Sequence, residues 1–269
     1  MTRPSANRAP ALVVSDLDGT LLGDDGAVSP RNAAALMRAA EAGARVVIAT
    51  GRPVYNLFPV IDMGFSGLAV CMNGAVVYDI GAGRVRSATL MQPNVMQDFA
   101  HDLEILDWQF ALAVERAVDT HRNFWAEESY LHPWDDVTVQ LAGRSDVLAD
   151  PAVKMYLRYG PKSTDVMGAV REVAAGRVTA TDSSGDGLLE IAGAGVTKAS
   201  ALDKLAASWG IDAADAIAFG DMPNDIEMLQ WAGRSVAMAN GHPDVLATAG
   251  EIGADHADDG VAQVLERWF

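Results

Sequence analysis

This 269-residue sequence contains a single cysteine, Cys71. One thiol excludes an intramolecular disulfide and a zinc site built from cysteines. Cys71 lies in the apolar run Ala69–Met72, which favours a buried core thiol over a catalytic one. We therefore do not expect cysteine chemistry to carry the function.

Basic residues are also scarce, with 20 Lys and Arg against 36 Asp and Glu and a formal net charge of -16. Nucleic-acid binding needs a basic surface, so this balance argues against a nucleic-acid partner. It would also repel a phosphorylated substrate unless the binding site brings its own cations. No apolar run is long enough to span a bilayer, and residues 1–10 lack a signal-peptide core. We therefore expect a cytoplasmic protein without a membrane partner, and the sequence carries no signal for oligomeric state.

The first third of the chain alternates strand and helix patterns. Strands are predicted at Ala11–Ser15, Arg45–Ala49 and Leu68–Met72, with a helix over Arg31–Ala42. This β-α-β-α-β order predicts a parallel sheet. The same rhythm returns after residue 193, beginning with a helix over Lys198–Ser208.

Candidate strands cluster in the middle of the chain, which is a different pattern. They lie at Phe110–Val114, Val137–Leu141, Val153–Tyr159, Val178–Thr181 and Leu188–Ile191. Helices are expected over Asn94–Leu106 and Ser163–Ala175, so an antiparallel sheet with helices on one face is indicated. We predict an α/β protein with a parallel-sheet core over residues 1–82 and 194–269, and an α+β unit inserted over residues 83–193.

Polar residues that could take part in catalysis or ligand binding follow several of the predicted parallel strands. Asp16 and Asp18 come directly after the first strand, where carboxylates are costly to desolvate unless a cation or hydrogen bonds compensate. Thr50 and Asp221 also lie just past strand ends, the edge where ligands of open α/β sheets bind. Lys198 opens a later helix and supplies positive charge. We expect these residues to meet in one crevice.

This set suits phosphoryl transfer through an aspartyl-phosphate. A carboxylate attacks phosphorus only when the negative charge of the phosphate is screened. Oxygen ligands from Asp16 and Asp221 suit Mg²⁺, which also binds substrate phosphate. Asp18 would then exchange protons with the leaving oxygen and with water. The groups expected to hold the phosphoryl oxygens are the Thr50 hydroxyl, the Gly51 N–H and the Lys198 ammonium.

Four motifs resemble, in order, those of the haloacid dehalogenase (HAD) superfamily: DLDGTLL at residues 16–22, TGR at residues 50–52, Lys198, and GDMPND at residues 220–225. Asn73-Gly74-Ala75 and the insertion resemble the Cof-type subfamily with a C2 (type IIB) cap. The resemblance covers nearly the whole chain. It implies a Rossmann-like core, a mobile cap and an Mg²⁺-dependent phosphatase acting on small phosphate esters such as sugar phosphates.

The resemblance also implies roles for residues at matching motif positions. Asp16 would be the nucleophile and an Mg²⁺ ligand. Asp18 would be the acid/base, and its backbone carbonyl would also bind the metal. The other implied roles are phosphate binding by Thr50 and Lys198, a place beside the phosphate for Asn224, metal binding by Asp221 and support of the metal ligands by Asp225.

Several features of the sequence fit two interpretations. Asn73 and Gly74 form a turn signal that would also fit a substrate contact. Arg52 would bind phosphate or pair with a surface acid. The aromatic and polar residues over 121–136 would line the substrate face of the insertion or form a surface loop. For the whole protein, a phosphomutase and a non-catalytic phosphometabolite sensor stay as alternatives, and hydrolysis is favoured because no second phosphate-binding cluster is evident.

Overall fold

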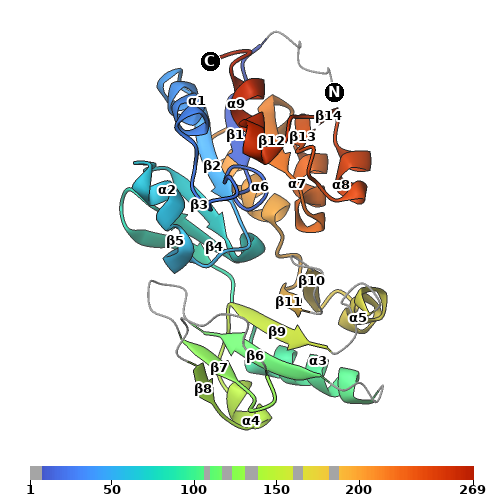
Figure 1. Ribbon diagram of the computed structural model, residues 1–269. Helices are drawn as coiled ribbons and strands as arrows, with labels where there is room; N and C mark the ends of the chain where they lie inside the picture. Colours follow the sequence, from blue (N-terminus) through green and yellow to red (C-terminus); the bar gives the residue numbers. More distant parts are fainter. Residues whose placement is uncertain (1–7, 106–109, 117–122, 131–138, 160–165, 182–187) are drawn as a thin grey trace. The chain divides into compact units, whose positions relative to one another are not determined.

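The computed structural model describes residues 8–105, 110–116, 123–130, 139–159, 166–181 and 188–269 (Figure 1). The chain divides into two compact units, Met1–Arg86 with Thr197–Phe269, and Ser87–Val196. The sequence placed the limits of the insertion at residues 83 and 193, a few residues earlier. Across the described ranges, no helix is both long enough and apolar enough to cross a membrane.

The first unit is built on an eight-stranded sheet in the order β14-β13-β12-β1-β2-β3-β4-β5. Its strands are β1 (Leu12–Ser15), β2 (Arg45–Ala49), β3 (Leu68–Cys71), β4 (Val76–Asp79), β5 (Arg84–Ala88), β12 (Ala216–Gly220), β13 (Arg234–Ala237) and β14 (Glu251–Ile252). Every neighbouring pair from β14 across to β3 is parallel, and β4 returns antiparallel to β3. The predicted α/β class with a parallel sheet is thus confirmed.

The first unit also contains helices. They are α1 (Pro30–Glu41), α2 (Phe58–Asp62), α6 (Lys198–Ser208), α7 (Ile226–Trp231), α8 (Pro243–Thr248) and α9 (Gly260–Leu265). The apolar residues of α6, α7 and α8 form one core with the sheet face that presents Leu12 and Val14. The helix predicted over Arg31–Ala42 is present as α1, which begins one residue earlier because the Ser29 side chain accepts the Asn32 N–H and Pro30 is the first helical residue.

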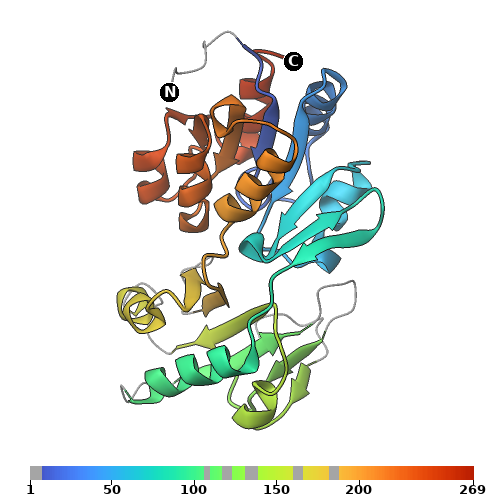
Figure 2. The ribbon, with the colours of Figure 1, turned by 180° about the vertical axis from the view of Figure 1, so that it is seen from behind.

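In the second unit, the residues that the structure describes form a six-stranded sheet in the order β10-β11-β9-β6-β7-β8 (Figure 2). Its elements are α3 (Pro93–Ile105), β6 (Ala111–Glu115), β7 (Phe124–Ala126), β8 (Val139–Leu141), α4 (Arg144–Val147), β9 (Lys154–Arg158), α5 (Met167–Ala174), β10 (Val178–Thr181) and β11 (Leu188–Gly193). Leu112 and Val114 of β6 share a core with the helices, whereas the intervening Ala113 belongs to a separate cluster on the other face. Period-two alternation therefore places the helices on one face.

Some elements differ from the sequence predictions. β7 forms within the stretch expected to be a loop or substrate face, and it pairs parallel to β8, whereas the expected sheet was antiparallel. Within that stretch, residues 121–122 and 131–136 lie outside the described residues. The strand β5 was not predicted, because its sequence RVRSA is polar and largely exposed. Nor was β14, whose two residues are too few for a pattern.

Candidate active site

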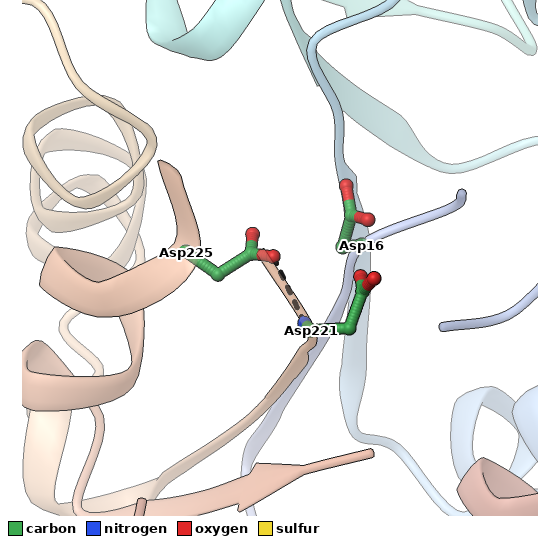
Figure 3. Close-up of side chains that lie close together, drawn as sticks. All are labelled: Asp16, Asp221 and Asp225. Atoms are coloured by element: carbon green, nitrogen blue, oxygen red, sulfur yellow. Dashed lines mark hydrogen bonds between the residues drawn. The ribbon is translucent and has the colours of Figure 1, made fainter. Parts of the chain in front are cut away.

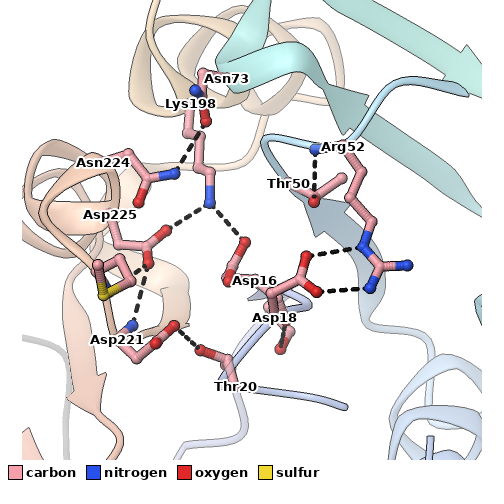
Figure 4. A network of polar contacts seen from close by, with 12 residues as sticks. Asp16, Asp18, Thr20, Thr50, Arg52, Asn73, Lys198, Asp221, Asn224 and Asp225 are labelled. Atoms are coloured by element: carbon pink, nitrogen blue, oxygen red, sulfur yellow. Dashed lines mark hydrogen bonds and ion pairs between the residues drawn. The ribbon is translucent and has the colours of Figure 1, made fainter. Parts of the chain in front are cut away.

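The carboxyl ends of three parallel strands place predicted polar residues at one edge of the sheet (Figure 4). Asp16 follows β1, Thr50 follows β2 and Asp221 follows β12. The register sets Ser15 beside Phe219 on one side and beside Ile48 on the other. Side chains far apart in sequence therefore meet, as the strand order predicts.

Lys198 is the buried cation of this edge. Its Nζ lies 2.6 Å from Asp16 Oδ1 and 2.7 Å from Asp225 Oδ1. It is the first residue of α6, where Thr197 and Ser200 form a reciprocal capping box. The cap fixes the start of the helix, and hence the point from which the lysine reaches Asp16.

Gly74 lets the chain approach this helix start. Its φ is +107°, and a Cβ there would lie 2.1 Å from the Thr197 carbonyl oxygen. Only glycine fits that space without a shift of backbone. The turn predicted at Asn73 and Gly74 is present between β3 and β4, while a substrate contact there stays a prediction.

Both carboxylate oxygens of Asp225 accept hydrogen bonds. Oδ1 accepts from Lys198, and Oδ2 accepts the backbone N–H groups of Asp221 and Met222, both at 3.1 Å. A Cβ on Gly220 would lie 2.6 Å from the Asp225 side chain, so this fit also requires glycine. Asp225 thereby holds the turn that carries Asp221, which Figure 3 shows beside Asp16.

Asp221 is held from the turn after β1 as well. The Thr20 hydroxyl donates to its Oδ1 at 2.8 Å. Gly19 has a φ of +72°, and a Cβ on it would lie 2.3 Å from Asp221 Oδ2. Neither contact with Asp221 was predicted from the sequence, although Thr20 and Gly19 both lie inside the DLDGTLL run that contains Asp16 and Asp18.

These carboxylates are crowded around one cation. Burial raises the pKa of Asp16 well above its ordinary value; Lys198 opposes this, and the nearby Asp225 and Asp221 add to it. Burial also raises the pKa of Asp221 to about 6, with Asp225 contributing. Burial alone would lower the pKa of Lys198, but Asp16 and Asp225 outweigh it and the pKa is raised. The crowding of these carboxylates therefore favours the binding of further positive charge beside them.

An Mg²⁺ ion fits this donor set. One carboxylate oxygen from each of Asp16, Asp221 and Asp225 lies within 4.8 Å of the others. Because both oxygens of Asp225 already accept hydrogen bonds, Asp16 and Asp221 are the better ligands of the three. Carboxylate oxygens are the ligands that Mg²⁺ prefers, and a cation here would relieve the repulsion that raises their pKa values.

Arg52 pairs with Asp18. Its Nε and Nη2 donate to the two Asp18 carboxylate oxygens at 2.8 Å and 2.6 Å, and its Nη1 donates to the Asn56 carbonyl at 3.2 Å. The pair is partly exposed, with 22% of the arginine side chain and 58% of the aspartate side chain accessible. The acid that Arg52 contacts is thus the predicted acid/base itself, and both of its carboxylate oxygens accept from the guanidinium.

Thr50, Asn73 and Asn224 form a polar chain across the site. The Thr50 hydroxyl accepts the Arg52 backbone N–H at 3.0 Å, and the Thr50 carbonyl accepts the Asn73 N–H at 3.1 Å. Asn224 Nδ2 donates to Asn73 Oδ1 at 3.0 Å, and its own buried Oδ1 has no partner among the described residues. Gly51 lies against Asn73, since a Cβ on it would be 3.2 Å from Asn73 Oδ1. The structure therefore brings these predicted residues together.

This chain is similar to known proteins in sequence and in structure. A family model described as haloacid dehalogenase-like hydrolase matches residues 13–265. The chain is 30% identical over 279 residues to 5-amino-6-(5-phospho-D-ribitylamino)uracil phosphatase YitU of Bacillus subtilis, covering 97% of this chain and 98% of that protein. It is 30% identical over 277 residues to HMP-PP phosphatase of Serratia proteamaculans, covering 96% and 95%. The structure of the HAD subclass IIB sugar phosphatase BT4131 matches with a TM-score of 0.76 at 21% identity, covering 95% of this chain and 97% of that one.

Proposed function

The chain belongs to the haloacid dehalogenase-like hydrolase family and is a phosphatase, and we propose that it hydrolyses small-molecule phosphate monoesters by Mg²⁺-dependent transfer of the phosphoryl group to Asp16. The family and the type IIB fold that the motifs resemble are confirmed. The observation that carries the proposal is the buried Lys198, which bridges Asp16 and Asp225 beside Asp221.

In the first step, a carboxylate oxygen of Asp16 attacks the phosphorus of the substrate. A bond forms between Asp16 and phosphorus while the bond from phosphorus to the ester oxygen breaks. Asp18 gives its proton to that ester oxygen, which leaves as an alcohol. Asp18 has to leave Arg52 for this role, because both of its carboxylate oxygens accept from the guanidinium in the observed pair.

In the second step, a water molecule attacks the phosphorus. Asp18 accepts the proton of this water, and the bond between phosphorus and Asp16 breaks. Inorganic phosphate leaves, and the carboxylate of Asp16 is restored while Asp18 keeps a proton for the next turnover. In the pair with Arg52 both Asp18 oxygens accept from the guanidinium, which orients the carboxylate for this step.

The phosphoryl oxygens need positive charge and hydrogen-bond donors throughout. Lys198 provides the charge, and its position is fixed by two buried carboxylates. The Thr50 hydroxyl uses its oxygen as an acceptor for the Arg52 N–H, which directs its proton to a phosphoryl oxygen. The Gly51 N–H and Asn224 complete the proposed phosphate site. When bound by Asp16, Asp221 and the Asp18 carbonyl, Mg²⁺ supplies further positive charge to the phosphate.

For the substrate, we propose a phosphorylated sugar or a similar small metabolite. The proteins similar to this chain include a phosphatase of a phospho-D-ribitylamino compound and a sugar phosphatase. The net charge of -16 supports a small substrate drawn in by local cations rather than a nucleic acid. We also propose that the inserted unit is the cap of this family, and that the protein acts in the cytoplasm.

Phosphate release from a panel of small phosphate esters tests this proposal. Wild-type protein and Asp16→Asn are each assayed with Mg²⁺ and with a chelator. Release that needs both Mg²⁺ and Asp16 supports the proposal and ranks the substrates. Release that persists in Asp16→Asn would contradict the nucleophile. No release from any ester would contradict hydrolysis and favour a phosphomutase or a phosphometabolite sensor.

A further inference from the structure

The loop between β13 and α8 contacts both backbone segments that carry the proposed metal ligands. The Asn240 side chain donates from Nδ2 to the Gly19 carbonyl at 2.8 Å, one residue after Asp18. Two residues further on, the His242 backbone N–H donates to the Asp221 carbonyl at 2.8 Å. One short loop therefore binds the turn after β1 and the turn after β12.

Gly241 allows this loop to lie close to its neighbours. A Cβ on Gly241 would lie 3.1 Å from the Asp221 carbonyl oxygen and 2.9 Å from the Met238 carbonyl oxygen. The Gly241 N–H closes the turn by donating to that Met238 carbonyl at 2.8 Å. The backbone of the loop is thus fixed, and the Asn240 side chain is the part that reaches across to the turn after β1.

His256 holds the same turn from a second point. Asn240 Oδ1 accepts the His256 backbone N–H at 3.1 Å. The His256 ring places Nδ1 2.7 Å from the Leu22 carbonyl, and since a carbonyl only accepts, Nδ1 carries the proton. The Leu22 N–H donates to the Leu17 carbonyl at 2.9 Å, so Leu22 belongs to the turn that contains Gly19.

We propose that Asn240 is a positioning residue for the phosphatase: it fixes the turn containing Asp18 and Gly19 at its distance from Asp221. This inference rests on the proposed function. One amide group does two tasks, because its nitrogen binds the Gly19 carbonyl and its oxygen binds the His256 N–H. A displacement of this turn would move the Asp18 carbonyl and the Asp221 carboxylate relative to each other, and Mg²⁺ tolerates little departure from octahedral geometry.

The test compares Asn240→Ala with a matched control. Thr248→Ala removes another exposed hydrogen bond from a side chain to backbone, the one from the Thr248 hydroxyl to the Asp244 carbonyl at 2.7 Å in α8. Mg²⁺ binding to the metal-free protein is measured by isothermal titration calorimetry, and kcat and KM by phosphate release. We expect Asn240→Ala to weaken Mg²⁺ binding and lower kcat by about two- to tenfold, the range of one net hydrogen bond. The control should match wild type.

A second variant separates positioning from general stability. Asn240→Gln keeps an amide donor and acceptor, and we expect it to recover part of the Mg²⁺ affinity that Asn240→Ala loses. The proposal is overturned if Asn240→Ala binds Mg²⁺ as tightly as Thr248→Ala, whatever its melting temperature. A wild-type protein that neither binds Mg²⁺ nor releases phosphate would contradict the proposed function, and this inference with it.

Discussion

Gly19 offers a test in which strain and steric contact can be separated. Its φ is +72°, and a Cβ would lie 2.3 Å from Asp221 Oδ2. Gly26, in the loop that follows, has a φ of +73° with nothing within 4 Å of the same ideal Cβ. An alanine would therefore have a similarly strained backbone at either position. Only at position 19 would its Cβ also clash with a proposed metal ligand.

The expected magnitudes follow from these two geometries. Left-handed backbone costs an alanine roughly 1–2 kcal/mol, so both variants should lose about that much free energy of unfolding. In Gly19→Ala, the Asp221 carboxylate or the turn must also move by about 1 Å to reach ordinary contact distance. A misplacement of that size costs on the order of 100-fold in kcat, and Mg²⁺ binding should weaken with it.

Three measurements on Gly19→Ala, Gly26→Ala and wild type check this reasoning. Urea denaturation gives the free energy of unfolding, calorimetry the Mg²⁺ affinity, and phosphate release kcat. We expect Gly26→Ala to retain wild-type Mg²⁺ affinity and kcat despite its strain. Agreement of the two variants within twofold in both Mg²⁺ affinity and kcat would contradict this prediction, because contact with Asp221 would then have no functional effect.

Three further predictions concern the charged groups of the site. Lys198→Met leaves two buried carboxylates without their cation and should lower the free energy of unfolding at pH 7 by about 3–5 kcal/mol in urea denaturation; a loss under about 1 kcal/mol would contradict the buried ion pairs. Burial raises the pKa of Asp221 from 3.8 to about 6, so the folded metal-free protein binds a proton there that the unfolded chain releases. Its stability should fall as pH rises from about 4 to about 6, and Mg²⁺ affinity, which competes with that proton, should drop below pH 6 in calorimetry; an affinity equal at pH 5 and pH 7 would refute this. Arg52→Gln removes the bidentate partner of Asp18 and should change stability by less than about 1 kcal/mol while lowering kcat at least about tenfold, and wild-type phosphate release would show that the pair is only a surface contact.

The sequence predicted those residues of the candidate site that directly follow the carboxyl ends of strands. Asp16, Thr50 and Asp221 follow strands whose apolar runs are easily recognised, and parallel strands bring their carboxyl ends to one edge. Lys198 was predictable only from its place among the four motifs, since a lysine at the start of a predicted helix is otherwise an ordinary exposed residue. The fold class was predictable because alternating helices and buried strands leave few topologies open.

Other contacts depend on the backbone path and leave no periodic signal. Asn240 and Gly19 are 221 residues apart in the chain, and the sequence indicates only a turn at Asn240. The sequence also could not identify which acid pairs with Arg52, because the chain has many exposed acids and only the folded turn brings Asp18 into reach. Polar or very short strands such as β5 and β14 were missed because their pairing comes from neighbouring strands rather than from their own apolar pattern.

The proposed mechanism requires Asp16 to carry the phosphoryl group during turnover. A rapid acid quench during turnover, followed by proteolysis and mass spectrometry, measures this directly on a substrate found in the ester panel. We predict one phosphoryl group on the peptide that contains Asp16, and none in Asp16→Asn. Continued phosphate release by Asp16→Asn, or a phosphoryl group on a different peptide, would contradict the nucleophilic role of Asp16.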